Sequence, residues 1–275
     1  MRFFFSAAIV FRSLPNSATP QELLDDPGKV GRVFKPATLS RVMGIVGELL
    51  ITFGVIVLLF LAWQLWINNA VVANQQQAAS QELSKEWSTD KDKSASAPAN
   101  EDFGPAPAFG GVADGAKFAT LYIPRLGPDS TRVVANGIDL STILDKGYYG
   151  HYPDTQWPGQ PGNFAVAVHR TGNGSPFADA PQLQPGDKIY VETQDGFYTY
   201  AVRNYEYVLP TSVDVLLPVP GSNNPANGEN IITITTCNPL LGDAERMIVY
   251  GVLESWRPQS AGPPPEMVKS QSGVS

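Results

Sequence analysis

One long apolar run near the N-terminus limits what this chain can fold into more than any other feature. Residues 42–67 read VMGIVGELLITFGVIVLLFLAWQLWI, and residues 49–67 carry no formal charge. As a helix, such a run is long enough to cross about 30 Å of hydrocarbon. A cleaved signal peptide is the alternative, but the run is too long, lies too deep in the chain and lacks an A-x-A cleavage site. We therefore expect one transmembrane helix over residues 42–67.

Charge on the two sides of this run predicts its orientation. Basic residues are frequent before it, whereas none follows it until Lys85. Because cytoplasmic flanks carry the excess of Lys and Arg, the N-terminus should be cytoplasmic. We expect a single-pass protein of the cell membrane, with a cytoplasmic segment over residues 1–41 and everything after the span extracellular. The basic residues before the span are Arg2, Arg12, Lys29, Arg32, Lys35 and Arg41.

Composition divides the extracellular part into three segments. Residues 68–116 are rich in Gln, Ala, Ser, Asp and Pro, and residues 258–275 have a similar character. We expect a flexible extracellular stalk in the first segment and a disordered tail in the second. We expect one folded domain between them, over residues 117–257.

The segment 117–257 carries short strand-like runs separated by Gly, Pro, Asn and Asp. Asp195-Gly196 lies between two of these runs and is a strong hairpin signal. We expect a mainly β domain: a closed antiparallel β-barrel with short helices near residues 140–145 and 175–182, preceded by the one transmembrane helix. The predicted strands cover residues 118–123, 164–169, 187–193, 197–208, 231–237 and 247–253.

Composition and missing motifs exclude several classes of function. The net charge is −7 and the isoelectric point is near 4.9, which argues against a nucleic-acid partner. The sequence has no CxxC, no HExxH and no histidine cluster, so we expect no metal site. It has no glycine-rich dinucleotide or phosphate motif either, and we expect no cofactor.

Cys237 is the only cysteine, and it ends the β-branched run 231–237. Outside the cytosol a lone cysteine cannot form an internal disulfide, so it is either a thiol that seeks a partner or a reactive nucleophile. Arg246 opens the next apolar run and would face Cys237 if the two runs pair as a hairpin. Because a thiol attacks carbonyls as the thiolate, it also needs a nearby base or cation and a group that stabilises the oxyanion.

Only two histidines are available as a base. His169 ends the apolar run 164–169 and should lie at the barrel rim, whereas His151 lies in a loop rich in Gly and Pro. Each residue alone has a plain structural interpretation: Cys237 as a small buried hydrophobe, His169 as a solvated strand end, and Arg246 as a surface cation. Together, the three predict a cysteine active site.

The same residues carry a family resemblance. The segment Thr233-Ile234-Thr235-Thr236-Cys237, with Arg246 nine residues on, resembles the TLxTC…R signature of sortases. Residues 164–170 resemble their catalytic-histidine strand, and residues 119–124 their opening strand. The loop 150–155 is most similar to class E, the housekeeping type of actinobacteria. The chain departs from the class pattern at Val168, where Gly is usual before the histidine.

The resemblance implies a sortase-type barrel and a transpeptidase mechanism. Cys237 would cleave the Thr–Gly bond of an LAxTG- or LPxTG-like sorting signal on a secreted protein, and an amine of a peptidoglycan precursor would resolve the thioacyl intermediate. His169 would be the acid and base, and Arg246 would stabilise the oxyanion. The resemblance implies no metal. Substrate-binding residues would be Thr236, Tyr152 and His151.

Two other functions stay open on the sequence. The domain could be a catalytically silent, membrane-anchored binding domain that keeps the barrel without turnover. It could also be a cysteine peptidase that uses water as the acceptor, which would need the same three residues.

Overall fold

The computed structural model describes residues 37–63, 67–88, 102–127, 130–224 and 228–271. The chain divides into two compact units, residues 1–57 and 58–275, and each is described by itself. Several predicted features lie outside the described residues. They are the cytoplasmic segment as far as residue 36, residues 64–66 of the predicted span, the middle of the stalk at 89–101 and the end of the tail at 272–275.

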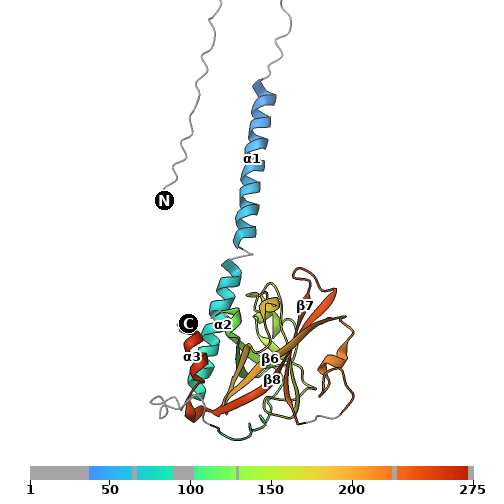
Figure 1. The fold of residues 1–275 in the computed structure, drawn as a ribbon. Helices are drawn as coiled ribbons and strands as arrows, with labels where there is room; N and C mark the ends of the chain where they lie inside the picture. The colour runs from blue at the N-terminus through green and yellow to red at the C-terminus, as the bar shows by residue number, and fades with distance from the viewer. Residues whose placement is uncertain (1–36, 64–66, 89–101, 128–129, 225–227, 272–275) are drawn as a thin grey trace, which may run out of the picture. The chain divides into compact units, whose positions relative to one another are not determined.

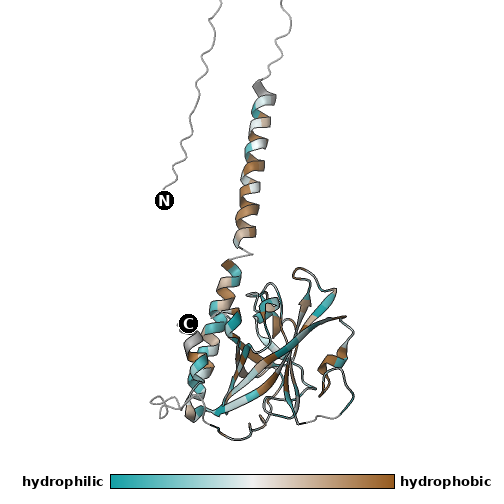
Figure 2. Ribbon diagram, in the orientation of Figure 1, coloured by the Kyte–Doolittle hydropathy of each residue, from teal (hydrophilic) through white to brown (hydrophobic). Residues whose placement is uncertain are grey.

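The predicted apolar helix is confirmed as α1, Ala37–Ala62. Within the described residues it is the one helix long and apolar enough to cross a membrane, over residues 40–62, and none of that stretch is buried against protein. Figure 2 shows its largely apolar colouring, which contrasts with the mixed colouring of α2, Asn68–Trp87.

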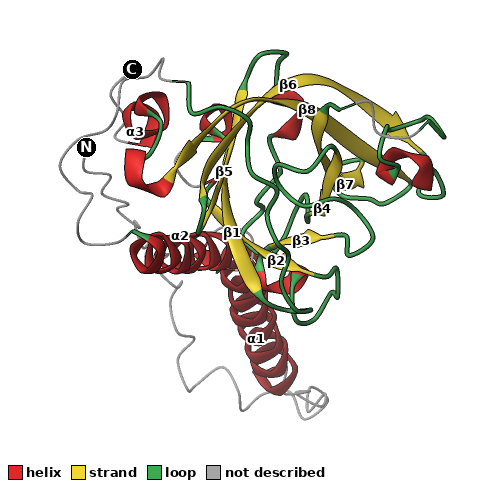
Figure 3. Ribbon diagram, turned by 90° about the horizontal axis from the view of Figure 1, so that it is seen from below, coloured by secondary structure: helices red, strands yellow, loops and turns green. Residues whose placement is uncertain are grey.

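Eight strands form a closed barrel in the order β1-β2-β3-β4-β7-β8-β6-β5 (Figures 1 and 3). The helical turns η2 (Pro124–Leu126), η4 (Leu144–Lys146), η5 (Ala180–Gln182), η6 (Val213–Leu216) and η7 (Gln259–Ala261) lie in the connections, and α3, Pro265–Gln271, follows the last strand. The strands are β1 (Lys117–Tyr122), β2 (Arg132–Asn136), β3 (Tyr149–His151), β4 (Gly162–Ala167), β5 (Lys188–Thr193), β6 (Gly196–Val208), β7 (Asn230–Asn238) and β8 (Glu245–Pro258).

The predicted closed, mainly β barrel is confirmed, but its pairing is not wholly antiparallel. β2 pairs with β3 in parallel, and so does β4 with β7, while the other neighbours are antiparallel. Parallel neighbours need a long return connection. Residues 168–229, which include the β5–β6 hairpin, supply that connection between β4 and β7. Apolar runs mark strands without stating their direction, so the sequence could not show this.

Side chains alternate between the two faces of the barrel wall. On β4, β7 and β8 the interior is filled by Phe164, Val166, Ile232, Ile234, Met247 and Val249, all nearly or fully buried. The outer face of β7 and β8 carries Ile231, Ile248 and Tyr250, which pack under Val215 of the β6–β7 connection. The strand residues of the candidate site therefore belong either to the packed interior or to this outer face.

The Asp-Gly signal is confirmed as the turn between β5 and β6. Gly196 has φ +152°, and a Cβ atom there would clash with the carbonyl oxygen of Arg257 on β8. Glycine is therefore required at this point, because the turn passes directly against the neighbouring strand.

The segments predicted as stalk and tail are partly ordered against the barrel. α2 lies along β1 and β2 (Figure 3), and its Gln76 and Ser80 are buried. Phe109 is 2% exposed and packs on Phe118 and Trp157, with ring centroids 5.4 and 5.8 Å away. In the tail, Met267 of α3 is buried with tyrosines of β1 and β5. The two buried residues of α2 are polar, so the sequence pattern does not mark the face of the helix that docks.

Substitution of Phe109 should therefore destabilise the barrel although it lies upstream of the first strand. Phe109→Ala removes a buried ring and leaves a cavity, and the expected loss in free energy of unfolding is about 3–5 kcal/mol. Urea unfolding of the full-length protein in detergent, followed by tryptophan fluorescence, measures it. Leu241→Ala is the matched control, because Leu241 is 91% exposed. Equal midpoints for the two variants would contradict the assignment of residues 102–116 to the folded domain.

Candidate active site

Cys237 and Arg246 lie directly opposite each other on β7 and β8, as predicted from the hairpin. Alternation along β7 turns Thr235 and Cys237 to the outer face and Thr236 to the interior. Cys237 is accordingly half-buried, while Thr236 is 2% exposed. The side chains of Cys237 and Arg246 therefore project from paired residues on the same face of the β7–β8 hairpin.

The parallel pairing of β4 with β7 brings His169 to the same place. Ala167 is in register with Thr235, and the Val168 amide donates to the carbonyl of Thr235 at 3.0 Å. Val168 points into the core at 4% exposure, so the next residue, His169, turns outward at the level of Cys237. The hydroxyl of Thr236 donates to the Val168 carbonyl at 2.8 Å and fixes this register. The register of β4, β7 and β8 therefore pairs Cys237 with Arg246 and places His169, two residues past the end of β4, at the level of Cys237.

The Arg246 side chain is partly engaged by its own loop. Nη1 donates to the backbone carbonyls of Asp243 at 2.8 Å and of Glu245 at 3.0 Å. Within the described part of the chain, Nε and Nη2 have no hydrogen-bond partner. Because the guanidinium is planar, the two bonds fix its orientation while leaving the other donors available to an incoming oxyanion.

Two residues beside the site were not identified from the sequence. Asp145 Oδ1 lies 2.9 Å from His169 Nε2 and belongs to η4, far upstream in the chain. Arg170 is 7% exposed, and its Nη1 donates to the Cys237 carbonyl at 3.4 Å and to the side-chain oxygen of Asn238. Because Arg170 follows His169 directly in the chain, the sequence could have placed it near the site. No motif around Asp145 identifies it as a site residue.

His151 occupies a different position from the one expected. Its ring is fully buried and packs against Trp157, with 4.2 Å between centroids and the ring planes tilted by 41°. Nδ1 bonds to the side-chain oxygen of Asn136 at 3.0 Å, and Nε2 lies 3.1 Å from the Gln156 carbonyl. Burial lowers the pKa of His151 to about 4, and backbone hydrogen bonds at Gln156 and Thr155 oppose the shift. The side chains of His151 and Thr236 are thus buried on the interior side of the barrel, away from the surface on which we expected a substrate.

Tyr152 does reach the outer face. Its hydroxyl lies 2.9 Å from Oγ1 of Thr235, the outward neighbour of Cys237 on β7, and the side chain is half-buried. Tyr152 therefore remains a candidate substrate-binding residue. In the described ranges, no cluster of three or more His, Cys, Asp or Glu side chains could hold a metal ion.

Comparisons with known proteins find relatives of this chain. A family model described as Sortase domain matches residues 121–254. Sortase SrtE1 of Streptomyces coelicolor is 35% identical over 243 residues, which cover 86% of this chain and 64% of that protein, so the chain spans less than two thirds of this relative.

Solved structures are similar over the barrel. The crystal structure of sortase E1 from Streptomyces coelicolor with a tripeptide in the active site is 38% identical, with a TM-score of 0.51, and the match covers 56% of this chain and 99% of that one. SrtA sortase from Actinomyces oris is 31% identical, with a TM-score of 0.57 and coverage of 60% and 94%.

The buried His151 should make folding stability depend on pH. Between pH 6.5 and pH 4 the unfolded chain binds a proton at this residue and the folded chain does not, so stability falls as the pH falls. The shift corresponds to about 3 kcal/mol across that window. His151→Gln should flatten the pH dependence of the urea midpoint relative to wild type. Parallel curves for wild type and His151→Gln would contradict the buried neutral ring.

Proposed function

The chain belongs to the sortase family, and we propose that it is a membrane-anchored cysteine transpeptidase of the class E type. In this proposal Cys237 is the nucleophile, His169 the acid and base, and Arg246 the oxyanion-binding residue. The observation that carries it is the register of three strands, which pairs Cys237 with Arg246 and brings His169 to the level of Cys237.

The first half-reaction forms a thioacyl enzyme. The Cys237 thiolate attacks the carbonyl carbon of Thr in the Thr–Gly bond, and the negative charge that develops on oxygen is met by Nε and Nη2 of Arg246. When the tetrahedral intermediate collapses, the C–N bond breaks and protonated His169 gives its proton to the leaving glycine amine. Arg170 supports the nucleophile indirectly, because its bonds to the Cys237 carbonyl and to Asn238 hold the end of β7 in place.

The second half-reaction transfers the acyl group to an amine. Neutral His169 removes a proton from the incoming amine as its nitrogen attacks the thioester, and the thiolate of Cys237 leaves. We propose a peptidoglycan-precursor amine as the acceptor and secreted proteins with LAxTG- or LPxTG-like signals as the donors. The family supports this choice, and so does the tripeptide bound in the active site of the related sortase E1.

The outer face beside Cys237 offers a surface for such a peptide. Thr235 lies on the face that carries Cys237, and the hydroxyl of half-buried Tyr152 lies 2.9 Å from its Oγ1. The β6–β7 connection borders it with exposed Leu209 and Val213, which suit the leucine of a sorting signal. We propose that residues 209–229 select the signal.

The anchor and orientation follow from the sequence and from α1. We propose that α1 crosses the cell membrane once, with residues 1–41 in the cytoplasm and the barrel outside. The catalytic domain would then face both the exported substrate and the cell-wall precursor.

One assay tests the function and separates it from a silent binding domain and from a hydrolase. Full-length protein in detergent is incubated with a quenched LAxTG peptide while an amine acceptor is titrated, and products are identified by mass spectrometry. We expect an amide product that grows with the amine, and no cleavage by Cys237→Ala. Peptide cleaved only by water would support the hydrolase, intact peptide would support the silent domain, and turnover by Cys237→Ala would remove the cysteine mechanism. An LPxTG peptide run in parallel tests the preference for the signal.

Arg246→Lys should be poorly tolerated, because an ammonium supplies a point charge where the guanidinium supplies a fixed fork. Loss of one oxyanion donor typically lowers the rate by about 10²–10³-fold, and we expect a fall in kcat of that order. Arg203→Lys is the matched control, since Arg203 lies on β6 and its closest ion pair is a 3.8 Å surface contact with Glu229. If both lysine variants kept kcat within a few-fold of wild type, Arg246 would be a surface cation only.

A further inference from the structure

The carboxylate beside His169 suggests how that histidine is oriented. Asp145 Oδ1 is 2.9 Å from Nε2, and the side chains of His169 and Asp145 are 24% and 51% exposed. A carboxylate accepts hydrogen bonds, so the neutral ring carries its proton on Nε2 and leaves Nδ1 as the basic atom. Asn173 Nδ2 donates to the same oxygen at 3.1 Å and fixes the carboxylate from a second side.

Helix α2 holds the turn that carries Asp145. Gln76 is 4% exposed, and its Nε2 donates to the carbonyl of Lys146 at 2.7 Å, one residue beyond Asp145. Its Oε1 accepts from the Val133 amide at 3.3 Å, so the amide group joins β2 to η4. At Gly147, where φ is +79°, a Cβ atom would lie 3.1 Å from Cγ1 of Val72 and 2.9 Å from the carbonyl oxygen of Asn173. The backbone after Asp145 therefore abuts α2 directly.

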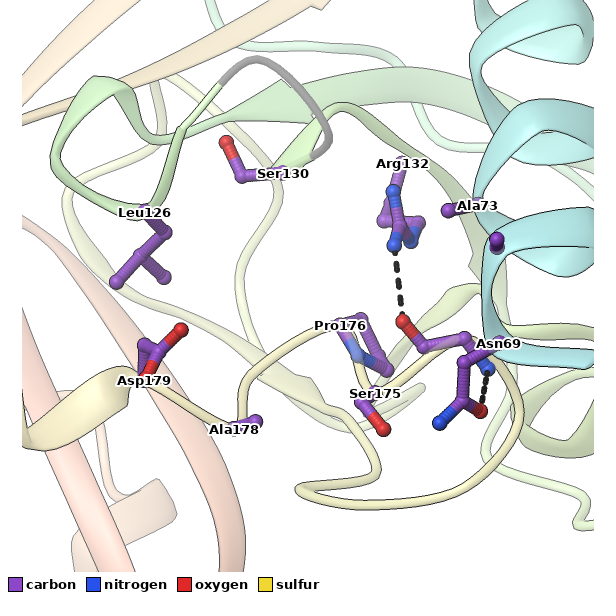
Figure 4. Close-up of a pocket in the computed structure, with 11 residues that line it drawn as sticks. Asn69, Ala73, Leu126, Ser130, Arg132, Ser175, Pro176, Ala178 and Asp179 are labelled. Carbon is purple, nitrogen blue, oxygen red and sulfur yellow. Dashed lines mark hydrogen bonds between the residues drawn. The ribbon is translucent and has the colours of Figure 1, made fainter. Parts of the chain in front are cut away.

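The same helix holds the turn that carries Asn173. The Gly174 amide donates to Oδ1 of Asn69 at 3.2 Å, and Arg132 Nη2 donates to the Gly174 carbonyl at 3.2 Å (Figure 4). A Cβ atom at Gly174 would lie 3.0 Å from Cγ1 of Val72. Asn69, Val72 and Gln76 are spaced three and four residues apart, so one face of α2 contacts both turns.

We propose that Asp145 is a positioning residue for His169 and that α2 keeps it in place. This inference rests on the proposed role of His169 as acid and base. The segment just after α1 would then be part of the working catalytic domain, because it contacts both the turn that carries Asp145 and the turn that carries Asn173. The competing interpretation is a surface ion pair of no kinetic consequence, which is common for exposed pairs.

Asp145→Ala is the first test. It should lower kcat by about tenfold or more, and by less than His169→Ala does, because general acid–base catalysis as a whole contributes about 10²–10⁴-fold. KM should be unchanged, since Asp145 orients a catalytic group without binding peptide. Asp145→Glu should restore part of the loss. Asp179→Ala, which removes another exposed carboxylate, should match wild type. A wild-type kcat for Asp145→Ala would overturn the proposal.

A double-mutant cycle tests the part played by α2. Gln76→Leu should lower kcat several-fold in the wild-type background and have no further effect in Asp145→Ala, because both changes act through one interaction. Ser80→Ala, another buried position of α2, should leave kcat unchanged in either background. Full additivity of Gln76→Leu and Asp145→Ala would overturn the link between α2 and Asp145.

A spectroscopic readout keeps this test separate from the test of function. With isotope-labelled histidine, ring ¹⁵N shifts of neutral His169 should report the Nε2-protonated form in wild type and a mixture of tautomers in Asp145→Ala. His151→Gln assigns the signals. If wild type cleaved no peptide, the proposed function would fail while this measurement still decided the role of Asp145. Identical His169 spectra in both proteins would overturn it.

Discussion

The parallel pairing of β4 with β7 is the constraint on which the site depends. It joins two strands far apart in the sequence, and its register decides what stands beside Cys237. Buried polar contacts reinforce it at both ends. Near the start, Thr233 Oγ1 donates to Asn163 Oδ1 at 2.6 Å, and near the end Thr236 Oγ1 donates to the Val168 carbonyl. A slip of one residue would turn His169 inward and bury it, because neighbouring side chains point to opposite faces.

Alternation along these strands also puts the candidate catalytic residues and the buried residues that hold the strands in register on opposite faces. The side chains of Cys237, Arg246 and His169 lie on the outer face of the barrel. Those of Thr236, Val168 and His151 are buried in its interior. The interior residues therefore act on the proposed reaction only through the backbone positions that they hold. His151 is the clearest case, since its ring is enclosed by aromatic side chains and burial lowers its pKa to about 4, which keeps it neutral at physiological pH.

The sequence could indicate the barrel because its long strands are apolar runs bounded by turn residues, and it could indicate the Cys237–Arg246 pair because one hairpin contains both. It could not indicate β2 and β3 as strands, since they are too short to show a pattern. Nor could it place α2, whose docking relies on the hydrogen bonds of Gln76 and Ser84 and on the contact of Val72 with two glycine turns. The contact of Asp145 with His169 could not be predicted for the same reason: a single hydrogen bond between distant turns leaves no periodic signal. His151 was expected in an open loop, but the aromatic rings that enclose it come from three separate segments.

The order of the strands along the chain has a kinetic consequence. β7 and β8 are the last two strands of the barrel in sequence, and they pair with β4 and β6, which are made earlier. Contacts between distant segments form slowly because the intervening chain must first be ordered. A nascent chain that has emerged only as far as the β5–β6 hairpin therefore contains the histidine and its carboxylate but no thiol. The proposed nucleophile, Cys237, lies on the β7–β8 hairpin that closes the barrel between β4 and β6.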